Sequence, residues 1–376
     1  METFRHLIVG AGMTAHAAAS AIRGADPSAE IAMLGDEAVG PYARPPLSKA
    51  LWTGQEERTI WLPPVEGLTL RTGASVAAID PAGHRVRLRD GTELGYERLL
   101  LATGGTPRRV PAWGDGVLYF RTIADQRRLR ALAAGSHVVV IGGGFIGSEL
   151  AASLTTAGYR VTLVFPEDGI GARLFPRDLS AHVTREYERR GVDVRPRERV
   201  LGVVPRGGRS IVTLGGGEVT ADLVVAGLGL APNTALAEQA GLAVDDGIVV
   251  DELLRTSRPD IWASGDVARF PSEVLGGKVR FEHEDNALTM GRHAGLSMAG
   301  VGEPYRHLPF FYSDLFDAGY EAVGTLDARL EVVAAWEEPF RKGILEYRDG
   351  GRVVGVLTWG IFGQMEEARA RLRAPR

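Results

Sequence analysis

A local pattern that occurs twice constrains the fold of this sequence more than any other feature. Its first copy is an apolar strand at residues 7–9, a glycine turn formed by Gly10, Ala11 and Gly12, and an alanine-rich helix that continues to Ile22. Gly10 allows the tight turn, and Gly12 lets the backbone approach a pyrophosphate closely. The pyrophosphate would lie at the helix N-terminus, where free N–H groups and the helix dipole favour an anion.

The second copy begins 132 residues later, at Gly142. It consists of a strand at residues 137–141, the full GxGxxG turn at 142–147, and a helix at 148–157. A single glycine turn between a strand and a helix also occurs in proteins that bind no ligand. Two copies are much harder to obtain by chance, so we predict two dinucleotide sites, one in each unit.

Each copy is followed by a second strand that ends near acidic residues. Asp36 and Glu37 follow the strand at 31–34, and Glu167 follows the strand at 159–165. A carboxylate at this place accepts hydrogen bonds from a ribose diol. The repeat also includes a set of short alternating strands and a closing strand that runs into a glycine-rich turn. These segments are residues 69–94 and 96–105 in the first copy, and 192–219 and 221–232 in the second.

Composition limits the chemistry of these sites. The sequence has no cysteine, which excludes disulfide scaffolds, thiolate metal sites and redox-active thiol pairs, and we predict no metal site. The net charge of −4 gives no sign of a nucleic-acid partner. No apolar stretch of about 18 residues exists, so no membrane span is expected, and we place the protein in the cytoplasm. Any electron transfer must therefore use bound cofactors.

Lysine is rare in this chain. Only Lys49, Lys278 and Lys342 are lysines among 43 basic residues. A lysine here hints that a compact ammonium is needed, although chance explains any single one equally well.

Five motifs, in chain order, carry a resemblance to a known class. The order GxGxxA, ATGG, GxGxxG, GLGLAPN and ASGDVA resembles the two-dinucleotide flavoprotein reductases of the glutathione-reductase type. PYARPPLSKALW (41–52), GGFIGSELA (143–151) and FEHEDNALTMGRHAG (281–295) are similar to NADH-dependent ferredoxin reductases of oxygenase systems. Residues 308–327 and 351–369 resemble the C-terminal domain of the apoptosis-inducing-factor family. The resemblance implies FAD in the first unit and NADH (NAD⁺) in the second.

Some features of the mitochondrial members are not found here. They carry a targeting presequence, a long insertion in the C-terminal domain and a basic surface linked to DNA binding, none of which this acidic sequence shows. We therefore do not expect the cell-death role.

The expected architecture follows from the repeat and the resemblance. We predict an α/β protein with two Rossmann-like domains and a small α+β C-terminal domain. Residues 1–114 and 243–303 form the FAD-binding domain, 115–242 the NADH-binding domain, and 304–376 the C-terminal domain. Residues 359–372 are expected to form the final helix, with acids early and arginines late, as suits the helix dipole.

The resemblance implies that Lys49 and Glu149 act at the flavin. Lys49 is similar to a family lysine near flavin N5, and Glu149 to its carboxylate partner. An ammonium there favours the anionic reduced flavin, and a carboxylate can hold the nicotinamide carboxamide. The alternative is a surface lysine and an unrelated helix glutamate.

Further roles are implied by the same resemblance. Arg44 and Arg108 resemble arginines that contact the phosphates or adenosine of FAD, although either can be a plain loop residue. Asp266 is the family's acceptor of ribityl hydroxyl groups, with a helix N-cap as the plain alternative. His283 is a candidate proton source for reduced flavin. The ring of Phe145 can cover the flavin, or simply pack in the core.

Cofactor preference is predicted from charge. Glu167 would repel a 2′-phosphate, which favours NADH, whereas Arg173 can bind either ribose or phosphate. The predicted catalytic residues are Lys49, Glu149 and His283. The predicted cofactor-binding residues are Gly10, Gly12, Met13, Thr14, Asp36, Glu37, Arg44, Lys49, Val76, Arg108, Gly143, Gly144, Phe145, Ile146, Glu167, Arg173, Gly229, Asp266, Glu282, His283, Glu284, Tyr312 and Glu321.

Two functions stay open on the sequence. The first is an NADH oxidoreductase that passes electrons from FAD to a ferredoxin-like iron–sulfur protein or another redox acceptor. The second is a slow NADH oxidase whose reduced, nicotinamide-bound state is recognised by a partner protein. A homodimer is one form that this reduced state can take. A flavin monooxygenase is less favoured because no substrate domain is left over. Arginine clusters at 127–130 and 185–190 are candidate docking patches for an acidic ferredoxin, or solvated helix faces.

Overall fold

The computed structural model describes residues 1–373, which divide into two compact units. Unit 1 comprises residues 1–43, 58–106 and 231–310, and unit 2 comprises residues 44–57, 107–230 and 311–373. Each unit is built around its own parallel sheet.

The sheet of unit 1 has seven strands. Its order is β3-β2-β1-β6-β5-β4, and β18 also pairs with β6. The strands are β1 (Glu2–Val9), β2 (Ile31–Leu34), β3 (Leu68–Arg71), β4 (Val76–Asp80), β5 (Arg85–Leu88), β6 (Glu93–Leu101) and β18 (Ile261–Ala263). β1, β2, β3, β6 and β18 pair in parallel, whereas β4 and β5 are antiparallel. Because parallel strands bury both faces, the central strands are apolar runs rather than alternating ones.

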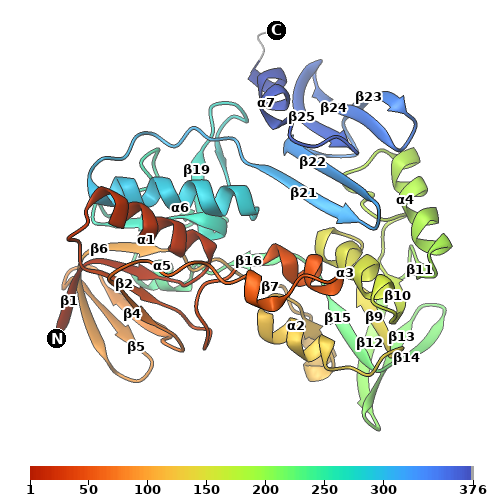
Figure 1. Cartoon of the computed structure of the whole chain (residues 1–376), viewed down its shortest axis with the longest axis horizontal. Coiled ribbons are helices and arrows are strands. Elements are labelled where there is room, and N and C mark those ends of the chain that lie inside the picture. Colours follow the sequence, from red (N-terminus) through yellow and green to blue (C-terminus); the bar gives the residue numbers. More distant parts are fainter. Residues whose placement is uncertain (374–376) are drawn as a thin grey trace. The chain divides into compact units, whose positions relative to one another are not determined.

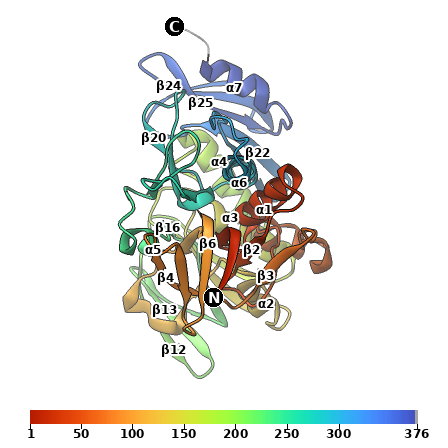
Figure 2. The same cartoon turned by 90° about the vertical axis from the view of Figure 1, so that its left-hand side faces the viewer.

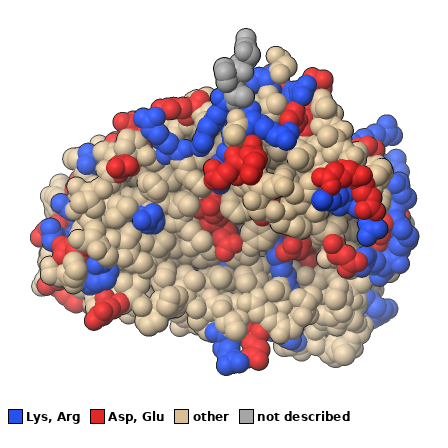
Figure 3. Space-filling view, turned by 45° about the horizontal axis from the view of Figure 1, so that its top comes forward, with Lys and Arg blue, Asp and Glu red and all other residues tan. Residues whose placement is uncertain are grey.

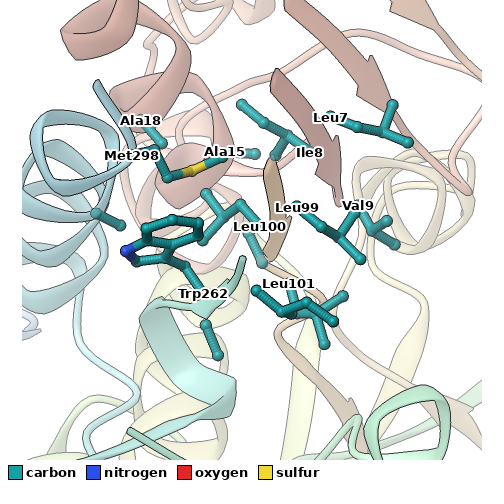
Figure 4. Close-up of a cluster of buried hydrophobic side chains, with 14 of the residues drawn as sticks. Leu7, Ile8, Val9, Ala15, Ala18, Leu99, Leu100, Leu101, Trp262 and Met298 are labelled. Atoms are coloured by element: carbon teal, nitrogen blue, oxygen red, sulfur yellow. The ribbon is translucent and has the colours of Figure 1, made fainter. Parts of the chain in front are cut away.

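Two long helices pack together on this sheet: α1 (Met13–Ala25) and α6 (Glu284–Ala299) lie side by side (Figures 1 and 2). Their contact is close because α6 presents Gly291 and Gly295 to the α1 backbone, where a Cβ would overlap the carbonyl oxygens of Thr14 and Ala18. Figure 4 shows the core beneath them, with side chains from β1, β6, α1 and α6 converging around Trp262.

Smaller elements complete unit 1. They are α5 (Ala235–Gln239), β17 (Ile248–Val249), β19 (Ala268–Pro271), β20 (Lys278–Val279) and the 3₁₀ turn Gly265–Val267. Unit boundaries fall within β7 (Gly105–Pro107), β16 (Leu230–Pro232), β21 (Phe310–Leu315) and the 3₁₀ turn Glu57–Thr59.

Unit 2 repeats the parallel arrangement. Its five-stranded sheet has the order β11-β10-β9-β15-β8, so β9, β10 and β11 correspond to β1, β2 and β3 of unit 1. The elements are β8 (Leu118–Tyr119), α2 (Ile123–Arg130), β9 (His137–Ile141), α3 (Phe145–Thr156), β10 (Arg160–Val164), α4 (Arg177–Arg189), β11 (Asp193–Arg195) and β15 (Leu223–Ala226). The 3₁₀ turns are Pro45–Ser48, Ala50–Trp52 and Pro111–Gly116. The repeat predicted from the two glycine turns is confirmed by these strand orders.

Two antiparallel sheets belong to the same unit. One contains β12 (Val200–Arg206), β13 (Arg209–Leu214) and β14 (Gly217–Ala221). The other has the order β21-β22-β25-β24-β23, with β22 (Ala318–Gly324), β23 (Glu331–Glu338), β24 (Lys342–Asp349) and β25 (Arg352–Trp359). The last helix, α7 (Met365–Arg373), packs against β22 and β25 (Figures 1 and 2).

The start of the final helix was predicted wrongly. Residues up to Trp359 continue β25, and α7 begins only at Met365. Gly360 and Gly363, both with positive φ, turn the chain between them. The helix predicted for 148–157 begins earlier, at Phe145, because the glycine turn leads directly into its first turn. None of the helices within residues 1–373 has the length and apolar character needed to cross a membrane.

Candidate functional site

The glycine turn of unit 1 has the shape that a pyrophosphate needs. Gly10 has a φ of +120°, and a Cβ there would overlap the carbonyl oxygen of Ala102. Gly12 differs, because no atom lies within 4 Å of the position its Cβ would take. Gly12 is also the N-cap of α1 and supplies no capping side chain. The turn therefore leaves open space at a helix N-terminus whose first residues, Met13 and Thr14, are buried.

Asp36 and Glu37 follow β2 as predicted, and both accept hydrogen bonds from neighbouring hydroxyl groups. Asp36 accepts one from Ser75, and Tyr42 donates to Glu37 Oε2 at 2.7 Å. Ser75 immediately precedes Val76, the first residue of β4. The hydrogen bond from Ser75 thus joins the acidic residues after β2 to the residue that precedes Val76, another predicted FAD-site residue.

Asp266 is buried in the 3₁₀ turn that follows β18. Ser264 is the N-cap residue of that turn, so the plain interpretation of Asp266 as an N-cap is wrong. Arg280 connects this turn to the next predicted segment: its Nη1 donates to the Asp266 carbonyl at 3.0 Å and to Glu282 Oε1 at 2.7 Å. Glu282 is therefore an ion-pair partner within unit 1.

His283 and Glu284 lie at the start of α6, where His283 is the N-cap residue. Desolvation lowers the pKa of His283 to about 4 and outweighs the carboxylates of Asp266 and Asp285, which act in the opposite direction. The ring is therefore neutral at pH 7. A neutral imidazole can still donate a hydrogen bond, but this pKa counts against the predicted role of proton source.

The glycine turn of unit 2 repeats the geometry of the first. A Cβ at Gly142 would lie 2.5 Å from the Gly227 carbonyl oxygen, and one at Gly143 would lie 2.7 Å from the Phe165 ring. Gly144, the N-cap of α3, has open space at its Cβ position and supplies no capping side chain. This turn therefore also fits a dinucleotide pyrophosphate.

Glu167 and Arg173 form an ion pair with each other. The Arg173 side chain is 82% exposed and that of Glu167 is 23% exposed. On the sequence alone, both residues are candidate partners of the adenosine ribose. Because the two side chains are paired, each reduces the net charge that the other presents to a bound nucleotide.

Lys49 and Glu149 are brought together by two elements that are 100 residues apart in sequence. Lys49 joins the 3₁₀ turns Pro45–Ser48 and Ala50–Trp52, and Glu149 lies in the second turn of α3. Lys49 Nζ is 3.1 Å from Glu149 Oε1, and the two side chains are only 12% and 5% exposed. A buried ion pair is expensive to desolvate, which makes it a strong candidate for a functional device.

Two serines that were not predicted from the sequence donate hydrogen bonds to Glu149. Ser48 Oγ donates to Glu149 Oε2 at 2.6 Å, and Ser313 Oγ donates to Glu149 Oε1 at 2.7 Å. Tyr312 was predicted, and its ring centroid lies 4.0 Å from Lys49 Nζ. Both serines occur within motifs that carry the family resemblance. Nothing in the spacing of the sequence indicates that they meet at one carboxylate.

The remaining predicted residues of unit 2 make contacts within the protein. The Phe145 ring packs edge to face on Phe311, with centroids 5.5 Å apart. Arg44 Nη1 donates to the Arg121 carbonyl at 3.1 Å, and Glu321 Oε2 accepts from the Gly363 N–H at 2.8 Å. Three other predicted residues are the exposed Arg108, Ile146 at 37% exposure, and Gly229 with a φ of +80°.

The arginine clusters are partly neutralised. Figure 3 shows Lys and Arg gathered at its right-hand edge, the side on which Figure 1 places α4 and β11. There Arg189 pairs with Glu186, and Arg190 with Asp317 at 2.5 Å. In the other cluster Arg127 pairs with Glu57. These ion pairs favour solvated helix faces over a docking patch.

Comparisons with known proteins agree with this geometry. The family model "Pyridine nucleotide-disulphide oxidoreductase" matches residues 4–291, and a model of the C-terminal domain of mitochondrion-associated apoptosis-inducing factor matches residues 294–339. The ferredoxin–NAD(+) reductase component of an anthranilate 1,2-dioxygenase system from Burkholderia cepacia is 39% identical over 98% of this chain and 94% of its own length.

Two further relatives cover nearly the whole chain. Mitochondrial apoptosis-inducing factor 1 from Dictyostelium discoideum is 33% identical over 98% of this chain and 78% of its own length. Putidaredoxin reductase, solved as a covalent complex with putidaredoxin, superposes with a TM-score of 0.89 at 33% identity, covering 99% of this chain and 92% of that one. The sequence has no cysteine for the disulphide chemistry in the family's name, which leaves its flavin and nicotinamide chemistry. On this evidence the chain belongs to the pyridine nucleotide-disulphide oxidoreductase family, within the FAD- and NADH-dependent reductases of the ferredoxin reductase class.

Proposed function

We propose that this protein transfers hydride from NADH to FAD and then passes electrons to a ferredoxin-type iron–sulfur protein. FAD is held by the Gly10–Gly12 turn of unit 1, and NADH by the turn of unit 2 that contains Gly144. Both turns combine open space with an uncapped helix N-terminus, which fits a dinucleotide pyrophosphate. Bound FAD supplies the capacity to accept a hydride and to release electrons one at a time.

The observation that carries this proposal is the buried ion pair between Lys49 and Glu149. We assign the Lys49 ammonium to stabilising negative charge on the reduced flavin, and the Glu149 carboxylate to orienting the nicotinamide carboxamide. Glu149 lies in α3, the helix that begins at the dinucleotide turn of unit 2. This placement fits a group that contacts the end of a nucleotide bound at that turn.

The acceptor is proposed from the relatives. The Burkholderia protein is a ferredoxin reductase component, and a structural relative is solved in complex with putidaredoxin. A second candidate is a slow NADH oxidase whose reduced state is recognised by a partner protein. The match of residues 294–339 to the apoptosis-inducing-factor C-terminal domain favours it.

Anaerobic reduction by NADH, followed by mixing with an oxidised [2Fe–2S] ferredoxin, separates these candidates. A reductase is expected to reduce the ferredoxin at many turnovers per second, in the usual range for enzymes. If no ferredoxin from an oxygenase system is reduced faster than oxygen, the second candidate replaces the first.

Three finer points stay predictions. They are the domain boundaries near residues 114, 242 and 303, a cytoplasmic location, and a homodimer.

A further inference from the structure

Strand β21 contacts both members of the buried ion pair through adjacent residues. The Tyr312 ring lies 4.0 Å from Lys49 Nζ, and Ser313 Oγ donates to Glu149 Oε1 at 2.7 Å. Ser313 is 1% exposed, so its hydroxyl group is shielded from bulk solvent. All these groups belong to unit 2.

A buried tyrosine of the same sheet lies near this carboxylate. Tyr320, in β22, is buried, and its burial together with the charge of Glu149 raises its pKa well above the usual range. The phenol therefore stays protonated and adds no second negative charge beside Glu149.

The Tyr320 ring is held in place by packing. It stacks on Trp359 of β25, with centroids 5.9 Å apart and an interplanar angle of 6°. Phe175 contacts both rings edge to face. This aromatic packing gives the sheet that carries Ser313 a firmly packed core.

We propose that Ser313 is a positioning residue that fixes the Glu149 carboxylate, and through it Lys49, for hydride transfer. The inference rests on the proposed function of the ion pair. Ser48 donates to Oε2 and Ser313 to Oε1, so each carboxylate oxygen has one serine donor. Ser48 precedes Lys49 directly, whereas Ser313 comes from the C-terminal sheet. That sheet thereby acts on the reaction without binding the nucleotide pyrophosphate.

The scarcity of lysine provides a readout that does not depend on turnover. In the FAD-loaded, ¹⁵N-lysine-labelled protein, only Lys49, Lys278 and Lys342 give side-chain ammonium signals. We expect Ser313→Ala to shift the Lys49 signal and leave the other two unchanged, because Glu149 loses a donor at the oxygen that Lys49 contacts. Ser313→Cys, which replaces the hydroxyl group by a weakly donating thiol, should give a smaller shift in the same direction. It also serves as the second variant if Ser313→Ala folds poorly.

A matched control removes another buried hydroxyl from the same sheet. Thr358, 1% exposed, donates to the main-chain carbonyl of Glu321 at 3.2 Å rather than to Glu149. Thr358→Val should leave the Lys49 signal and the rate of flavin reduction as in the wild type.

Anaerobic single-turnover reduction by NADH gives the second readout. Ser313→Ala should slow flavin reduction about 10-fold, as expected for one lost hydrogen bond to a charged group. In a Glu149→Gln background the same change should slow flavin reduction by less than about 2-fold. Ser313 acts through the Glu149 carboxylate, and that carboxylate is absent from this background.

Each outcome has one meaning. An unmoved Lys49 signal in both Ser313→Ala and Ser313→Cys overturns the inference, and so does an equal rate loss in both backgrounds. A shifted signal with normal rates in Ser313→Ala and in Glu149→Gln shows instead that the contact exists but that the proposed function of the ion pair is wrong.

Discussion

The charge at Lys49 is enclosed by protein groups rather than by water. Its ammonium lies between the Glu149 carboxylate and the Tyr312 ring, and its side chain is 12% exposed. Arginine is the usual cation of this sequence, but a planar guanidinium is wider and distributes its charge over three nitrogens. Lys49→Arg should therefore leave flavin reduction well below the wild-type rate while retaining the charge. Full activity in this variant would mean that only the net charge matters.

The adenosine end of NADH provides a second test on single residues. We expect the wild type to be reduced faster by NADH than by NADPH, because Glu167 opposes a 2′-phosphate. Glu167→Ala should narrow this gap and also release Arg173 from its ion pair. Stopped-flow reduction with both nucleotides measures the effect. If the wild type prefers NADPH, Arg173 rather than Glu167 governs this end of the site.

His6 should make stability depend on pH. It is 1% exposed, neither ring nitrogen has a hydrogen-bond partner, and burial followed by the charges of Arg98 and Arg5 lowers its pKa to about 4. Well above pH 6.5 the ring is neutral in both states. As the pH falls from 6.5 towards 4, the unfolded chain binds a proton that the folded protein does not, so stability falls, by about 2 kcal/mol at pH 5.

The matched variant is His6→Phe, which cannot take up this proton. Urea unfolding near pH 7.5 and near pH 5 should show a smaller loss of stability for the variant than for the wild type. His283 titrates in the same direction in both proteins, so the difference between them isolates His6. An identical loss in both would contradict the assignment.

Among the secondary-structure elements, the helix pair of α1 and α6 depends on glycine. Gly295→Ala would place a Cβ against the Ala18 carbonyl and force the two helices apart. We expect a loss of about 1–3 kcal/mol in the free energy of unfolding, the usual cost of overpacking. Gly24→Ala, on α1 but with open space around it, is the control and should not destabilise the protein. Equal stability of both variants would show that the helices do not pack this closely.

A substitution in the first glycine turn can test cofactor binding without disturbing the fold. Gly12→Val should be tolerated by the fold, because the Cβ position is open and the φ of −92° suits any residue. The side chain would occupy the space proposed for the pyrophosphate, so the variant should purify colourless, whereas the wild type should be yellow with one non-covalent FAD. A yellow Gly12→Val protein with full flavin content would move the FAD site elsewhere.

The two dinucleotide-binding elements could be predicted because their signals are local. The strand at 31–34 and the strand at 137–141 were placed to the residue, since a short apolar run next to a glycine turn leaves little choice. Only the start of the last helix was misplaced, because Gly360 and Gly363 adopt positive φ and keep residues 360–364 out of the helix. Ser313 could not be found from sequence, because its partner Glu149 lies 164 residues away and hydrogen bonds over that distance leave no periodic signal.

In the whole molecule, the two parallel sheets repeat one strand order, whereas the C-terminal sheet has no counterpart in the repeat. Unit 2 carries the nucleotide turn, the ion pair and the strand that contacts both of its charges. The sequence has no cysteine, so redox-active thiols do not take part in electron transfer. Flavin reduction is therefore the step at which Lys49 and Glu149 are expected to act as one unit.

Anaerobic single-turnover reduction of the wild type, Lys49→Ala, Glu149→Ala and the double variant tests this claim directly. Each single change leaves one buried charge without its partner, so we expect each to slow flavin reduction by about 10- to 1000-fold. The double variant should lose far less than the product of the two single losses. Losses that multiply independently, or a near-normal rate for Lys49→Ala, would contradict the account.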